Sequence, residues 1–125
     1  MQHQACNQPV VLVVEDETLL RWSAVSTAQD AGFCAVEAGS AIEAIAILEN
    51  RNDIRIVFTD IQMPGSMDGL RLAHLISTRW PPIKILATSG RLKLRDDDLP
   101  EGGRYLHKPY AVSDLAATLR DLIAA

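Results

Sequence analysis

The chain has 125 residues, of which 48% are hydrophobic and 22% charged, and its formal net charge is −4 at pH 7. This length fits one domain with its own core. The acidic balance argues against nucleic acid as the main partner, because a phosphate backbone requires a basic surface. No apolar stretch of the sequence approaches the roughly 18 residues that a membrane-spanning helix needs.

Residues 1–9 lack the basic region and apolar core of a signal peptide. We therefore expect a disordered lead-in over residues 1–9 and one domain over residues 10–125, in a cytoplasmic protein that binds neither membranes nor nucleic acid directly. The two cysteines, Cys6 and Cys34, are too few for a disulfide scaffold, so free thiols are expected.

Five apolar runs are the predicted strands. Their hydrophobicity is continuous rather than alternating, which is typical of strands covered on both faces of a parallel sheet. The runs cover residues 10–14, 33–38, 54–60, 83–89 and 105–107.

Helical patterns separate these runs. The first covers residues 18–31 and ends at Gly32. Ser40 and Glu43 form a capping-box pattern at the start of the second. Its expected inner face consists of Ile42, Ile45 and Leu48.

The third helix, residues 69–79, is predicted to begin at an Asp68 cap and to stop before Pro81. Ser113 is the expected cap of the last helix, whose Leu115, Leu119 and Leu122 should face the sheet. The crossover over residues 90–104 is polar and predicts only a short or irregular helix. The repeated alternation of strand and helix indicates a doubly wound parallel α/β fold with right-handed crossovers.

Polar residues gather where the predicted strands end, and ligands bind at this edge of open parallel sheets. They are Glu15, Asp16 and Glu17 after the first strand, Asp60 at the end of the third, Thr88 and Ser89 at the end of the fourth, and Lys108 after the fifth. Each alone has an ordinary explanation, such as a helix cap or a surface lysine, and Glu17 fits a stabilising helix start. Their common location favours a site.

Clustered carboxylates repel each other unless a cation compensates. Mg²⁺ binds one or two carboxylates together with phosphate oxygens, and Asp16 and Asp60 could supply that pair. Such a set suits phosphoryl transfer, with Asp60 as a nucleophile that forms an aspartyl phosphate. No His, Cys or Ser stands with an acid–base partner at a recognisable catalytic spacing, so a hydrolase triad is poorly supported.

Four motifs in order, VLVVEDE, FTDIQMPGSMDG, ATSG and YLHKPY, resemble the receiver domain of two-component response regulators, in the CheY-like superfamily. The resemblance covers residues 10–124. It implies a flavodoxin-like (βα)5 fold with a five-stranded parallel sheet in the order 2-1-3-4-5. It also implies a signalling switch rather than an enzyme, one that catalyses only its own phosphorylation and slow dephosphorylation.

The resemblance implies a role for each site residue. These roles are Asp60 as phosphoacceptor and metal ligand, Asp16 as a direct Mg²⁺ ligand, Glu15 acting mostly through water, the backbone carbonyl of Gln62 as a further ligand, and Lys108 as the partner of the phosphoryl group, with a cis peptide bond to Pro109. Ser89 is the expected switch hydroxyl because Ser89-Gly90 fits the family pattern, with Thr88 in reserve. Tyr105 stands at the position of the switch aromatic, although burial in the core would also explain it.

Three features depart from the common family pattern. The loop after Asp60 is one residue longer, with the surplus at Gly65-Ser66, and Glu15 replaces the more usual Asp. The segment 90–104 is shorter and more polar than a normal fourth crossover. This puts in doubt the face that many receivers use to dimerise or to bind partners.

The expected function is a switch that accepts a phosphoryl group on Asp60, in a Mg²⁺-dependent reaction, from a sensor histidine kinase or a histidine phosphotransfer protein. Its target would be a downstream effector protein or an output domain outside this chain. Two alternatives stay open. One is a small aspartate-nucleophile phosphohydrolase, in which Gln62 stands where a general acid is needed; the other is a pseudo-receiver that only binds partners.

Overall fold

The computed structural model describes residues 7–63, 67–91 and 94–125. The elements are β1 (Val10–Val14), α1 (Thr18–Asp30), β2 (Cys34–Ala38), α2 (Ala41–Asn50), β3 (Ile54–Asp60), α3 (Gly69–Arg79), β4 (Lys84–Ser89), the 3₁₀ helix η1 (Asp96–Asp98), β5 (Arg104–His107) and α4 (Val112–Ala124). All of the predicted strands are confirmed to within one residue at each end. Most of the predicted lead-in and the Gly65-Ser66 surplus lie outside the described residues.

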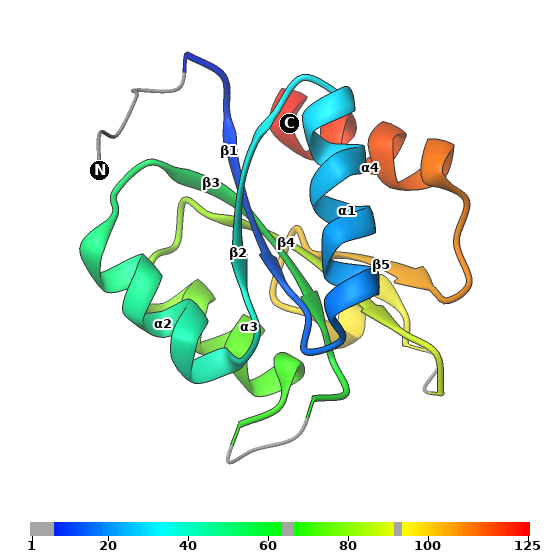
Figure 1. Cartoon of the computed structure of the whole chain (residues 1–125). Helices are drawn as coiled ribbons and strands as arrows, with labels where there is room; N and C mark the ends of the chain where they lie inside the picture. The colour runs from blue at the N-terminus through cyan, green and yellow to red at the C-terminus, as the bar shows by residue number, and fades with distance from the viewer. Residues whose placement is uncertain (1–6, 64–66, 92–93) are drawn as a thin grey trace.

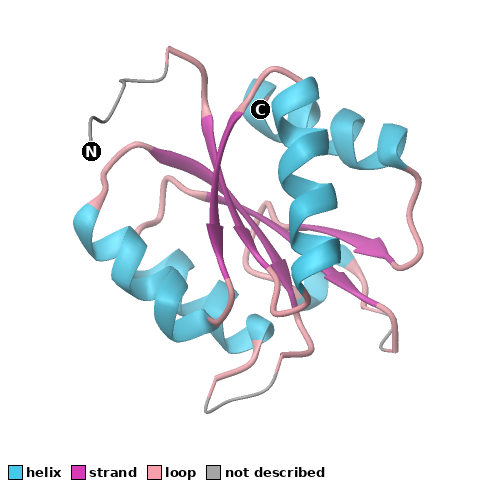
Figure 2. Cartoon of the chain, viewed as in Figure 1, coloured by secondary structure: helices cyan, strands magenta, loops and turns pink. Residues whose placement is uncertain are grey.

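The strands form one parallel five-stranded sheet in the order β2-β1-β3-β4-β5, as expected. Helices α1 and α4 cover one face, and α2 and α3 cover the other (Figure 1). Because all strands run the same way, their carboxyl ends meet at one edge (Figure 2). Every polar residue predicted at a strand end is thereby brought to that edge.

Strand β1 lies inside the sheet and supplies both layers of the core. Leu12 and Val14 pack in the layer beneath α2 and α3, whereas Val11 and Val13 pack in the layer beneath α1 and α4. All five residues of the strand are buried. Burial on both faces explains why the sequence of this strand is apolar without alternation.

The inner face of α2 differs from the prediction at one position. Ile42 is 65% exposed, whereas Ala41, Ala44 and Leu48 are buried. Ile42 follows Ala41 by one residue and therefore lies about 100° round the helix from the buried face. The predicted cap is confirmed, since the Ser40 hydroxyl accepts a hydrogen bond from the backbone N–H of Glu43 (3.1 Å).

The start of α4 also differs from the prediction. The helix begins at Val112, and the cap position belongs to Ala111, so Ser113 lies inside the first turn. The predicted leucines Leu115, Leu119 and Leu122 are all buried. A serine cap contributes only about 1 kcal/mol, and burial of three leucines contributes more than that, roughly 1.5–3 kcal/mol each. The packing of the leucine face therefore decides where the helix lies.

In the described residues of the fourth crossover the helical structure is one 3₁₀ turn, η1, which agrees with the short or irregular helix predicted from its polar sequence. Within this turn, Asp98 Oδ2 accepts a hydrogen bond from the N–H of Arg95 (2.9 Å). The side chain of Asp96 connects the turn to β5, because Asp96 Oδ1 accepts a hydrogen bond from the N–H of Tyr105 (3.0 Å). Leu99, which follows the turn, is buried against Ile61 and Ala87.

The expectation of a free thiol is wrong for Cys34, which is disulfide-bonded. Its backbone N–H donates to the carbonyl of Pro9 (2.9 Å), so the segment that precedes β1 lies beside the start of β2. Composition alone could not reveal this proximity. Cys6 lies outside the described residues.

Gly69, the first residue of α3, packs directly against the end of β3. Its N–H donates to the carbonyl of Ile61 (2.9 Å). A Cβ on Gly69 would meet the carbonyl oxygen of Asp60, and it would lie 2.7 Å from the Asp60 carbonyl carbon and 2.8 Å from Ile61 Cα. These are backbone atoms that no side-chain rotation can move, so this position requires glycine.

We predict that Gly69→Ala lowers the free energy of unfolding by about 2 kcal/mol or more, because the methyl group forces the backbone of Asp60 to shift. Urea denaturation measures the loss. Gly39→Ala is the matched control, since the nearest atom to its new Cβ is Arg21 Nη1 at 3.4 Å, which is an ordinary van der Waals distance to a side chain. Equal losses in the two variants would contradict the prediction.

Candidate functional site

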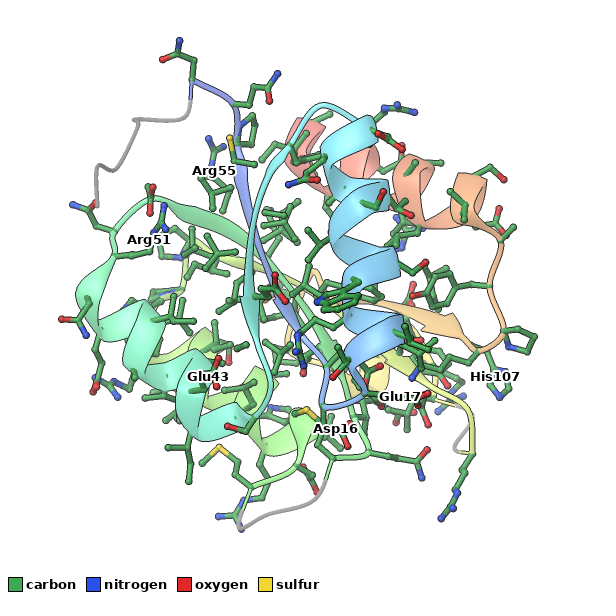
Figure 3. All side chains as sticks on the ribbon, viewed as in Figure 1. Asp16, Glu17, Glu43, Arg51, Arg55 and His107 are labelled. Atoms are coloured by element: carbon green, nitrogen blue, oxygen red, sulfur yellow. The ribbon has the colours of Figure 1, made fainter. Side chains whose placement is uncertain are left out.

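Three carboxylates meet at the carboxyl edge of the sheet. Glu15, Asp16 and Asp60 each place one oxygen atom within 4.8 Å of the others. Glu15 and Asp60 are buried, with 6% and 7% of their surface exposed, whereas Asp16 is exposed. Figure 3 shows Asp16 and Glu17 at this end of the molecule and Arg51 at the opposite end. The predicted clustering of acids is therefore present.

Lys108 connects two of these carboxylates. Its Nζ lies 2.7 Å from Asp60 Oδ2 and 3.0 Å from Glu15 Oε1. Burial alone would lower the pKa of Lys108, but its hydrogen bonds to Asp60 and Glu15 outweigh this effect and raise the pKa. Lys108 is therefore a cation at neutral pH. Its peptide bond to Pro109 is cis, as the resemblance implies.

The same surroundings favour the charged form of Lys108 but disfavour the charged form of Glu15. Burial raises the pKa of Glu15, and hydrogen bonds from Lys108 and from the N–H of Glu17 oppose that rise only in part. The nearby charge of Asp60 raises it further. The ionised form of Glu15 is thus maintained at a cost that a bound cation would reduce.

Backbone groups orient the acids. The N–H of Gln62 donates to Asp60 Oδ1 (2.9 Å), and the N–H of Glu17 donates to Glu15 Oε2 (3.2 Å). Arg21 was not predicted as part of the site, yet its Nη1 donates to the Glu15 carbonyl (2.9 Å) while its Nε pairs with Glu37 Oε1 (2.9 Å). No local pattern in the sequence marks Arg21, because Arg21 lies on α1 and its partner Glu37 lies on β2, 16 positions along the chain.

The two candidate hydroxyls at the end of β4 have different surroundings. Ser89 Oγ donates to the side-chain oxygen of Gln62 (2.7 Å), and the Ser89 carbonyl accepts from the N–H of Lys108 (2.9 Å). Thr88 Oγ1 is buried and has no hydrogen-bond partner among the described residues. The sequence predicted a role for the backbone carbonyl of Gln62 and showed that its side chain is not a general acid, but the hydrogen bond from Ser89 to that side chain was not predicted.

Tyr105 is half-buried on β5. Its hydroxyl donates to the Ser89 carbonyl (3.2 Å), and its ring packs against the small cluster of Ile61, Ala87 and Leu99. It therefore makes core contacts, which was the simpler explanation for an aromatic residue at this position. It is also in direct contact with the residue expected to carry the switch hydroxyl.

The donor set fits a hard divalent cation. Glu15, Asp16 and Asp60 offer carboxylate oxygens close enough together to hold one ion. Carboxylate oxygens in small number, beside open solvent, are the ligands that Mg²⁺ prefers. The exposure of Asp16 leaves room for the water molecules that Mg²⁺ retains.

Comparison with known proteins agrees with this arrangement. The model of the response regulator receiver domain matches residues 11–120. The chain belongs to this family, whose members are phosphorylation switches of two-component systems and are generally not enzymes. In the part of the chain that the structure describes, no helix is both long and apolar enough to span a membrane.

Among its relatives, the response regulator protein FleR of Pseudomonas aeruginosa is 35% identical over 117 residues, which are 91% of this chain and 24% of FleR. The sensor kinase CckA of Brucella abortus is 33% identical over 117 residues, which are 90% of this chain and 12% of CckA. The chain thus spans a quarter or less of the length of these relatives. The crystal structure of a response regulator receiver protein from Sinorhizobium medicae superposes with a TM-score of 0.88 at 28% identity, over 95% of this chain and 97% of that one.

The unpaired hydroxyl of Thr88 leads to a stability prediction. Thr88→Val keeps the branched shape and removes a buried hydroxyl that has no partner among the described residues. We expect the free energy of unfolding to stay the same or to rise by about 1 kcal/mol. Ser89→Ala is the comparison, since it breaks the bond to Gln62 and should cost about 1 kcal/mol. A larger loss for Thr88→Val than for Ser89→Ala in thermal denaturation would contradict this reading.

Removal of the Lys108 ammonium should destabilise the fold in the absence of Mg²⁺. Lys108→Met leaves Glu15 and Asp60 buried without a compensating cation, at a cost of about 3 kcal/mol at neutral pH. The loss should shrink as the pH falls, because protonation removes the charge of Glu15, and the raised pKa of Glu15 makes this begin at a higher pH than for an exposed glutamate.

Urea denaturation in a chelator at several pH values measures this effect. Lys84→Met, at the opposite end of β4, is the matched control and should change stability by no more than about 0.5 kcal/mol. A loss for Lys108→Met that grows on acidification would show that the ammonium does not compensate the two carboxylates.

Proposed function

We propose that Asp60 accepts a phosphoryl group from a sensor histidine kinase or a histidine phosphotransfer protein, and that the modified domain then acts on a downstream effector or on an output domain outside this chain. The observation that supports this most directly is the position of Asp60. It lies in one cluster with two further acids and is hydrogen-bonded to Lys108 (2.7 Å). Membership of the receiver family supports the same conclusion.

In the proposed reaction a carboxylate oxygen of Asp60 attacks the phosphorus atom of a phosphohistidine. The phosphorus–nitrogen bond breaks, and its electron pair remains on the imidazole nitrogen. The residues that would hold Mg²⁺ are Asp60, Asp16, the Gln62 carbonyl and, through water, Glu15. When bound there, the ion would neutralise charge on the phosphoryl oxygens. The Lys108 ammonium, which now pairs with the Asp60 carboxylate, would pair with the phosphoryl group instead.

The proposed switch uses Ser89 and Tyr105. The Ser89 hydroxyl would turn to a phosphoryl oxygen, and Tyr105 would move inward after it. The contact between the Tyr105 hydroxyl and the Ser89 carbonyl (3.2 Å) supports such a coupling, because a shift of Ser89 changes the acceptor of Tyr105. A change from mostly inactive to mostly active needs about 5 kcal/mol of differential stabilisation.

The two other functions have less support. An aspartate-nucleophile phosphohydrolase needs a general acid two residues after the nucleophile, and here that residue is Gln62. Its neutral amide is already hydrogen-bonded to Ser89 and Arg91. A pseudo-receiver would not require two further acids and Lys108 to be gathered around Asp60.

The proposal predicts that the protein gains the mass of one phosphoryl group when it is incubated with acetyl phosphate and Mg²⁺, and that Asp60→Asn abolishes the gain. Asp68→Asn is the matched control. Asp68 caps α3 by accepting from the N–H of Arg71 (2.9 Å), and Asn caps equally well. Intact-mass spectrometry after short incubation measures the adduct. An adduct that persists in Asp60→Asn, or none on the unchanged protein, would refute the proposal.

A further inference from the structure

The side chain of Gln62 joins two parts of the site. Its backbone N–H donates to Asp60 Oδ1 (2.9 Å), while its side-chain oxygen accepts from Ser89 Oγ (2.7 Å) and from the N–H of Arg91 (3.1 Å). One residue of the β3–α3 loop therefore contacts the expected phosphoacceptor with its backbone and the expected switch hydroxyl with its amide. Gln62 is half-buried, and Ser89 is fully buried.

The direction of these bonds follows from their chemistry. The backbone N–H of Arg91 can only donate, so the atom of Gln62 that it meets is the amide oxygen. Ser89 Oγ meets the same oxygen and must donate its hydrogen to it. The N–H of Arg91 also approaches Ser89 Oγ (3.3 Å), which is then an acceptor toward Arg91. The three groups are thus hydrogen-bonded to one another.

A serine hydroxyl carries one hydrogen. It cannot donate that hydrogen to Gln62 and to a phosphoryl oxygen at the same time. Formation of a bond between Ser89 and the phosphoryl group therefore requires the bond to Gln62 to break. The phosphoryl oxygen is the stronger acceptor because it is charged, but the bond that is given up reduces the net gain.

We propose that Gln62 is a positioning residue that holds the Ser89 hydroxyl in the unphosphorylated state and so weakens the response of the site to a phosphoryl group. This inference rests on the proposed function, with Ser89 as the hydroxyl that reaches the phosphoryl group. The same amide holds Arg91, the second residue after β4.

The test compares Gln62→Met with the unchanged protein. Methionine is similar in length and is a poor acceptor, so the variant removes the bond to Ser89 while it keeps the backbone carbonyl of residue 62. The probe is beryllofluoride with saturating Mg²⁺, which mimics an aspartyl phosphate and is not hydrolysed, so changes in dephosphorylation do not enter. We expect Gln62→Met to bind the probe about fivefold more tightly, the factor that corresponds to one ordinary hydrogen bond.

The second arm repeats this comparison in a Ser89→Ala background. If Gln62 acts through the hydroxyl, Gln62→Met has no effect on affinity there. Gln29→Met, on the exposed surface of α1, is the control for the substitution itself. Amide hydrogen exchange gives an independent readout, since the N–H of Arg91 should exchange faster in Gln62→Met without the probe.

Each outcome is decisive. The inference is supported if Gln62→Met binds the probe more tightly in the parent background and has no effect on the affinity in the Ser89→Ala background. An equal gain in affinity in both backgrounds overturns the inference, because Gln62 would then act on Asp60 directly. Unchanged or weaker binding of the probe by Gln62→Met overturns it as well. If the unchanged protein neither binds the probe nor gains mass with acetyl phosphate, the proposed function itself fails. If it does both, a negative result for Gln62 concerns this inference alone.

Discussion

The bridge from Lys108 to Asp60 and Glu15 is the interaction on which the site depends. Two buried carboxylates close to each other are costly, and the ammonium group is the cation that offsets that cost in the described structure. Lys108 follows β5, whereas Asp60 ends β3, and β4 lies between these strands. The lysine side chain must therefore cross the end of β4. The small residue Gly90 lies there, and even a Cβ on it would lie 3.7 Å from the Cβ of Lys108. This is an ordinary van der Waals distance, so the lysine side chain passes the end of β4 without a steric conflict.

The second constraint is the backbone that holds Asp60 in place. Gly69 brings the first turn of α3 against the Asp60 carbonyl, so the chain leaves the end of β3 and returns to it within one loop. On the opposite side, Arg21 ties the carbonyl of Glu15 to Glu37 on β2. Neither residue carries a reacting group. They fix the backbone at the end of β3, where Asp60 lies, and just after β1, where Glu15 lies, and so hold these two acids close to each other.

Features that follow from apolar runs and from the shared edge of parallel strands were predictable, whereas individual side-chain pairings between distant elements were not. The strands and the location of Asp60 follow from continuous apolar runs and from the rule that parallel strands share a carboxyl edge. The bond from Ser89 to Gln62 joins residues 27 positions apart and left no periodic signal. The exposure of Ile42 and the disulfide of Cys34 likewise depend on which surfaces meet, which a single helix or strand pattern does not contain.

In the unphosphorylated site the groups proposed to act already have partners. Asp60 accepts from Lys108 and from the N–H of Gln62, Ser89 donates to the Gln62 amide, and the Tyr105 hydroxyl donates to the Ser89 carbonyl. A phosphoryl group would therefore exchange these bonds rather than add to an empty site, and only the difference between old and new bonds could drive a transition. Among the described residues of the crossover between β4 and β5, the turn η1 is tied to the backbone of Tyr105, and Arg91 is tied to Gln62 and Ser89. The exchange of bonds at Ser89 would therefore reach the two ends of this crossover through Arg91 and Tyr105.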